Sequence, residues 1–263
     1  MQMLINLEHP HKQTEPSMPL LQLGFRPFFL LAGISAALFI LVWGLFFSSS
    51  RIAGLNVTAY GPVYWHGHEM IFGFVAAVVA GFLLTAVKNW TGRQTATGTL
   101  LLMLVLLWVL ARVLPFIPAT FPYWMIALID ISFLPAVAAS LLPLLIKTRN
   151  FRNLIFIGIL LLLSAANIVF HMGVAGWFEY GQRYGLHAAI YMIILLISIM
   201  GGRVIPIFIE RGLADGFQRR SYPVIEISAS LVLLLLGVLH TANVSGVYII
   251  TVAVMAAVLH FIR

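Results

Sequence analysis

Five histidines lie near the ends of apolar segments, at places that an alternating membrane topology brings to one side. His66 and His68 begin one segment, His171 ends another, and His187 and His240 lie at the start and the end of two more. Imidazole is a common ligand of haem iron and copper, and neighbouring helices of a bundle can hold a metal between them. The sequence therefore predicts a metal or cofactor site in one layer, with these five as candidate ligands.

Polar residues accompany some of these histidines at helical spacing. Ser164, Asn167 and His171 are three and four residues apart, which forms one stripe that is costly in lipid and is expected to face inward. His187 and Tyr191 form a similar pair. Histidine and tyrosine are also common at membrane interfaces, where a polar tip meets the headgroups, and that alternative stays open for each single histidine.

The histidines of the second apolar segment are close in sequence but not in direction. His66 and His68 are two residues apart, about 200° around a helix, so both can face one ion only if the segment begins in a non-helical conformation. One of them is then expected to orient a ligand or to carry a proton. Glu69, which follows directly, is a candidate supporting residue.

Two charges fall inside apolar segments, Arg112 and Asp130. Both are expected in the half of the membrane that holds the five histidines, where they can form an ion pair. Such a pair either locks two helices together or serves a proton relay beside the site.

The second apolar segment also carries Gly73, Ala77 and Gly81 at four-residue spacing, which predicts close approach of a neighbouring helix.

The elements that must position these residues are membrane-spanning helices. The 263 residues are 62% hydrophobic and 9% charged, too few polar residues to cover a water-soluble globule. A helix needs roughly 20 apolar residues to cross the hydrocarbon of a bilayer. The sequence predicts an all-α, polytopic transmembrane bundle of about eight spans, at residues 28–48, 68–87, 99–114, 123–146, 153–172, 185–205, 222–240 and 247–262.

Charge distribution predicts the orientation of the bundle. Residues 1–20 form a polar tail, expected in the cytoplasm, and residues 21–263 form the membrane domain. With the N-terminus inside, only Arg51, Arg112 and Arg183 of the 15 Lys and Arg residues lie toward the outer side. The basic residues are spread over loops, so no nucleic-acid partner is expected. The chain has no cysteine, which excludes disulfides and thiolate metal ligands within it.

Several sequence motifs together point to one known family. They are Phe25-Arg26-Pro27-Phe28-Phe29, Trp65-His66-Gly67-His68-Glu69-Met70, the stretch GFLLTAVKNWTG at 81–92, Arg112, Asp130, and Gly201-Gly202-Arg203-Val204-Ile205-Pro206. In these motifs the chain resembles the NnrS family. The resemblance implies a bacterial inner-membrane protein with haem and copper, associated with nitric oxide metabolism and with protection against nitrosative stress. Family members have more spans than this chain, which is therefore expected to be a shortened or C-terminally incomplete version.

Three functional hypotheses follow. The first is a haem- and copper-binding inner-membrane protein that takes part in nitric oxide metabolism and protects against nitrosative stress. The five histidines are its candidate ligands, with Glu69, Arg112, Asp130, Asn167 and Tyr191 in support. The second is a transporter of a metal ion, haem or a small solute, with Arg112 and Asp130 on its pathway. The third is a haem-copper reductase that acts on nitric oxide; no electron donor is assigned.

Overall fold

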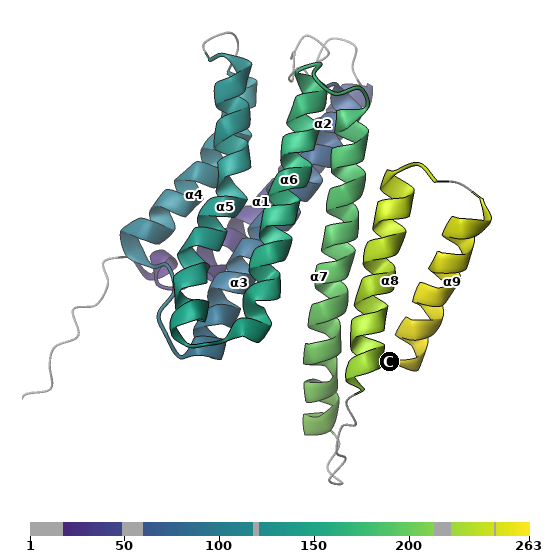
Figure 1. The fold of residues 1–263 in the computed structure, drawn as a ribbon. Helices are drawn as coiled ribbons and strands as arrows, with labels where there is room; N and C mark the ends of the chain where they lie inside the picture. The colour runs from purple at the N-terminus through teal and green to yellow at the C-terminus, as the bar shows by residue number, and fades with distance from the viewer. Residues whose placement is uncertain (1–17, 49–59, 118–120, 213–221, 245) are drawn as a thin grey trace, which may run out of the picture.

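A single bundle of helices contains all the regular structure in the part of the chain that is described (Figure 1). The computed structural model describes residues 18–48, 60–117, 121–212, 222–244 and 246–263. The tail expected over residues 1–20 lies almost entirely outside these ranges, as do Arg51 and the tail histidines. Within them, the predicted all-α fold is confirmed.

Each predicted apolar segment is a helix. Within the described ranges, seven helices are long and apolar enough to cross a membrane, and the eighth, of 16 residues, is shorter. The chain is therefore a multi-pass membrane protein, as the sequence predicts. The helices are α1 (Phe25–Ser48), α2 (Pro62–His68) continuing through η3 (Glu69–Val75) into α3 (Ala76–Thr91), α4 (Gly98–Val113), α5 (Tyr123–Lys147), α6 (Leu154–Val174), α7 (Gly181–Gly212), α8 (Pro223–Thr241) and α9 (Val247–Ile262).

The second span, formed by α2, η3 and α3, lies at the centre of the bundle. Of its most apolar window, 61% is buried, against 11% for α8. Helices α1, α5 and α7 all contact it, and the chain then continues outward through neighbouring pairs α6–α7, α7–α8 and α8–α9 (Figure 1). Residues on the second span therefore have the largest number of helical partners within reach.

A π-helical segment interrupts this central span. Segment η3 follows directly after His68, so the wider helical turn begins between His68 and Glu69. π-helical segments are rare in proteins, but where they occur they often lie at functional sites. They redirect side chains that a regular helix would place elsewhere. The hydrophobic pattern of the sequence gives no indication of this π-helical segment, so it is not predicted from the sequence.

Small residues let the first helix approach the second span. A Cβ atom on Gly73 would lie 2.8 Å from Phe39, and one on Gly81 would lie 3.0 Å from Phe28 and 2.9 Å from Phe29. The close approach predicted from the spacing of Gly73, Ala77 and Gly81 is confirmed, and α1 is the helix that uses it.

Helices α6 and α7 approach even more closely, backbone against backbone. A Cβ atom on Gly185 would lie 2.6 Å from the carbonyl oxygen of Ala166 and 2.7 Å from the amide nitrogen of Phe170. Glycine at this position therefore sets the distance between α7 and the helix that carries His171.

Replacing Gly185 with alanine tests this contact. A methyl group cannot move α6 backbone atoms aside, so Gly185→Ala is expected to cost about 1–3 kcal/mol of stability, measured by unfolding in detergent. Gly158→Ala, also on α6, is the matched control, because nothing lies within 4 Å of its Cβ position. Equal stability of the two variants would contradict the account.

Candidate metal centre

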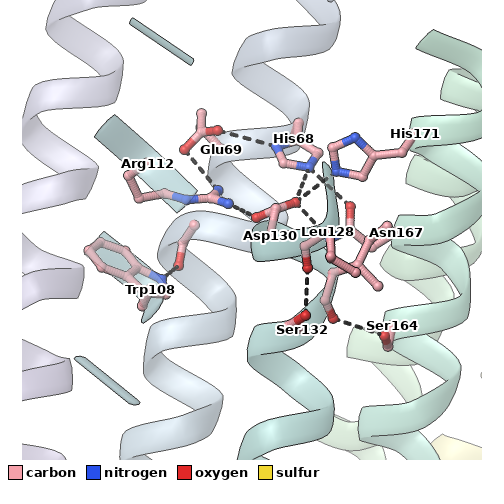
Figure 2. A network of polar contacts seen from close by, with 12 residues as sticks. His68, Glu69, Trp108, Arg112, Leu128, Asp130, Ser132, Ser164, Asn167 and His171 are labelled. Atoms are coloured by element: carbon pink, nitrogen blue, oxygen red, sulfur yellow. Dashed lines mark hydrogen bonds and ion pairs between the residues drawn. The ribbon is translucent and has the colours of Figure 1, made fainter. Parts of the chain in front are cut away.

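Two imidazoles and one carboxylate converge in the buried interior of the bundle (Figure 2). His68 Nε2 lies 3.1 Å and His171 Nε2 lies 2.9 Å from the same atom, Asp130 Oδ2. Asn167 donates from Nδ2 to that oxygen at 2.8 Å. All four side chains are at most 5% exposed. Three donor atoms from different side chains therefore surround one point.

Three helices supply these donors. His68 ends α2 where the π-helical segment begins, Asp130 lies on α5, and Asn167 and His171 lie one turn apart on α6. The four-residue spacing on α6 places Asn167 and His171 on one face, as the sequence predicts. Ser164, the third member of the stripe, is buried and donates to the carbonyl oxygen of Ile131 on α5 at 3.3 Å, so the stripe faces inward as expected.

Both histidines have a second partner on the other ring nitrogen. His68 Nδ1 lies 3.2 Å from Glu69 Oε1, and His171 Nδ1 lies 2.6 Å from the hydroxyl of Tyr123. Outer hydrogen bonds of this kind are typical of metal-ligating histidines, because they fix the ring and direct the opposite nitrogen toward the metal. The two Nε2 atoms are oriented toward Asp130 in this way.

Arg112 connects the two carboxylates of the centre. Its Nη1 atom lies 2.9 Å from Glu69 Oε2, and its Nη2 atom forms an ion pair with Asp130 Oδ1. The predicted pairing of Arg112 with Asp130 is confirmed. With both imidazoles neutral, two carboxylates and one guanidinium give the centre a net charge of −1, and an uncompensated buried charge is costly.

The hydrogen-bonding capacity of His68 locates this missing positive charge. One ring nitrogen faces the Glu69 carboxylate, and the other faces Asp130 Oδ2 and, at 3.1 Å, the amide oxygen of Asn167. A neutral imidazole has only one N–H, so one of its nitrogens presents a lone pair to oxygen lone pairs. A second proton or a metal cation at this point satisfies the arrangement.

Aromatic side chains cover the centre. Tyr60 packs at 5.3 Å from the ring of His68 and at 5.9 Å from that of His171, and it is 4% exposed. Burial raises the pKa of the Tyr60 phenol well above its ordinary value, with a further contribution from the charge of Tyr123, so the phenol stays protonated. Neither Tyr60 nor Tyr123 is predicted as a site residue from the sequence, because Tyr60 precedes its apolar segment and Tyr123 begins one.

His66 lies apart from this centre. Its ring stacks on Trp43 of α1 with centroids 4.2 Å apart, and its Nδ1 atom is buried without a hydrogen-bond partner among the described residues. His66 and His68 thus face different neighbours, as the 200° separation predicts.

The remaining two candidates form a third group on α7 and α8. The rings of His187 and His240 stack with centroids 5.0 Å apart, and the Tyr191 hydroxyl lies 3.0 Å from His240 Nδ1. The structure therefore divides the predicted layer into a buried pair, a stacked pair and a single histidine.

The fold and the site together define a polytopic membrane protein with a buried histidine–carboxylate centre. A family model described as NnrS protein matches residues 19–263 of this chain, nearly its whole length, and the chain belongs to that family. Membership points to a membrane protein of the nitric oxide response. Comparison with curated proteins and with solved structures gives no match.

The charge balance of the centre can be tested by removing its cation. Arg112→Met leaves Glu69 and Asp130 buried without compensation, which is expected to cost about 3–5 kcal/mol of stability against unfolding in detergent. The double variant Arg112→Met/Glu69→Gln removes one of the two stranded charges and is expected to be more stable than Arg112→Met alone. Independent, additive losses would show that the three side chains do not act as one network.

Proposed function

We propose that this protein binds haem and copper in the bacterial inner membrane, takes part in nitric oxide metabolism and protects the cell under nitrosative stress. His68, Asp130 and His171 are the proposed copper ligands. The observation that carries the proposal is the convergence of three donor atoms from three helices on one buried point, at a centre that lacks one positive charge. The motifs of the NnrS family, found across the chain, support the choice of cofactors.

The donor set fits a first-row transition-metal ion. Bonds of about 2.0–2.1 Å in a tetrahedral site separate neighbouring donor atoms by about 3.3 Å. The separations of 3.1 and 2.9 Å between the Nε2 atoms and Asp130 Oδ2 are close to this value. Imidazole nitrogen suits copper, and a monovalent copper ion would bring the formal charge of the centre to zero.

The other histidines are the candidates for the haem. Tyr191 holds the ring of His240 through Nδ1, which leaves Nε2 as the atom available to an iron. His187 stacks on that ring, and His66 offers a buried nitrogen without a partner among the described residues. When bound, haem iron and copper supply centres that take up nitric oxide and exchange electrons.

A reductase acting on nitric oxide is a second candidate function. The Tyr123 hydroxyl lies 2.6 Å from His171 Nδ1 and Arg112 pairs with Asp130, so protonated groups adjoin two of the proposed copper ligands. Sustained consumption of nitric oxide by the purified protein with an added electron donor supports turnover. Uptake that stops after one equivalent supports a binding role.

Copper content of single variants tests the proposed ligands. His68→Ala and His171→Ala are each expected to lower copper affinity at least about tenfold, because each removes one of three donors. His260→Ala is the matched control, since His260 on α9 hydrogen-bonds with Ser198 on α7, and neither residue belongs to the proposed copper site. Equal copper content in all four proteins, with normal membrane insertion, would refute the copper assignment.

The spectrum of the purified protein tests the wider proposal. We expect a haem absorption band that shifts on addition of nitric oxide, together with near-stoichiometric iron and copper. His240→Ala and His187→Ala are expected to reduce the haem band and to leave copper bound at the buried centre. A colourless protein without metal, from cells supplied with haem and copper, would overturn the proposal and favour the transporter.

A further inference from the structure

An apolar groove leads from the lipid-facing surface to Arg112. It lies between α1 and α4 and encloses about 350 Å³. Its outer walls are half-exposed aliphatic side chains, among them Ile34, Leu38 and Val113. Its inner surface is buried and includes Ser35 beside Phe39, Trp108 and Arg112.

Arg112 has one unused donor at this inner end. Its two terminal nitrogens pair with Glu69 and Asp130, whereas Nε is buried without a hydrogen-bond partner among the described residues. A buried donor of this kind is costly unless a ligand supplies an acceptor. The guanidinium that lines the inner end of the groove therefore has one hydrogen-bond donor to spare, directly beside the candidate metal centre.

The charge of this end selects against an anion. The guanidinium is already compensated by two carboxylates, and the centre totals zero even with a monovalent cation in place. A carboxylate or another anion would therefore find no surplus positive charge, and it would have to cross apolar walls first. A lipid acyl chain suits the walls but offers no acceptor to Nε.

We propose that the groove between α1 and α4 is the entry path by which a small uncharged diatomic molecule passes from the bilayer to the centre. This inference rests on the proposed function and names the route of its ligand. Molecules such as nitric oxide are apolar enough to concentrate in hydrocarbon, fit between the aliphatic walls and carry one weak acceptor for Arg112 Nε. Arg112 then forms the boundary between the groove and the metal ligands.

Xenon tests the groove without reference to the cofactors. Xenon is a small apolar probe, and crystals under xenon pressure are expected to show an atom between Leu38 and Val109 in the native protein. Val109→Trp is expected to abolish that site. Leu110→Trp is the matched control, since Leu110 is exposed and does not line the groove. A continuous acyl chain in place of xenon, or no xenon there, would overturn the entry path.

Association kinetics test whether the ligand uses the route. Val109→Trp and Leu38→Trp are expected to slow binding of nitric oxide to the purified holoprotein at least about tenfold, with metal content and the final spectrum unchanged. Leu110→Trp and Leu41→Trp, both on lipid-exposed positions outside the groove, keep the native rate. Native rates in both groove variants would contradict the proposal. A native protein whose spectrum does not respond to nitric oxide would instead contradict the proposed function, and the xenon experiment would still decide the groove.

Discussion

The buried ion-pair network of Glu69, Arg112 and Asp130 constrains the arrangement of the central helices. Hydrocarbon cannot solvate charge, so a guanidinium and two carboxylates at this depth are tolerable only where their helices bring them together. The second span, α4 and α5 each contribute one member. Asp130 extends the network to α6 through Asn167 and His171. Charge and hydrogen bonding thereby hold four spans in one relative position. These contacts matter because the hydrophobic effect does little to drive helix association inside a lipid bilayer.

The same network explains why the candidate centre has the composition it has. Arg112 offsets only one of its two carboxylates, and His68 cannot donate to the oxygens on both of its sides while neutral. The arrangement is therefore complete only with one further positive charge among His68, Asp130 and His171. A metal ion meets this requirement where two imidazole nitrogens point at a carboxylate. The π-helical segment begins between His68 and Glu69, the two residues of the second span that contact Asp130 and Arg112.

Much of the fold follows from the sequence, because membrane-spanning length and intramembrane polarity are local properties. The lengths of the apolar segments predict the helices, and the three- and four-residue spacing predicts that the polar stripe ending at His171 faces inward. The cost of burying charge predicts the pairing of Arg112 with Asp130. The angle of about 200° between His66 and His68 predicts that these two side chains face different neighbours. The lateral order of the helices is not local, so the separation of the His187–His240 pair from the buried centre could not be predicted. Tyr60 and Tyr123 could not be predicted for the same reason: Tyr60 precedes α2, Tyr123 begins α5, and only tertiary packing brings both to His171 on α6.

Pulsed electron paramagnetic resonance of the copper(II)-loaded protein tests the central claim most directly, because it counts the imidazole nitrogens that couple to the bound ion. The account predicts coupling to two imidazoles in the native protein, and the same coupling in the double variant His187→Ala/His240→Ala, whose side chains lie outside the buried centre. Coupling to no imidazole, or a two-imidazole signal that disappears in that double variant, would contradict the assignment of the centre to His68, Asp130 and His171.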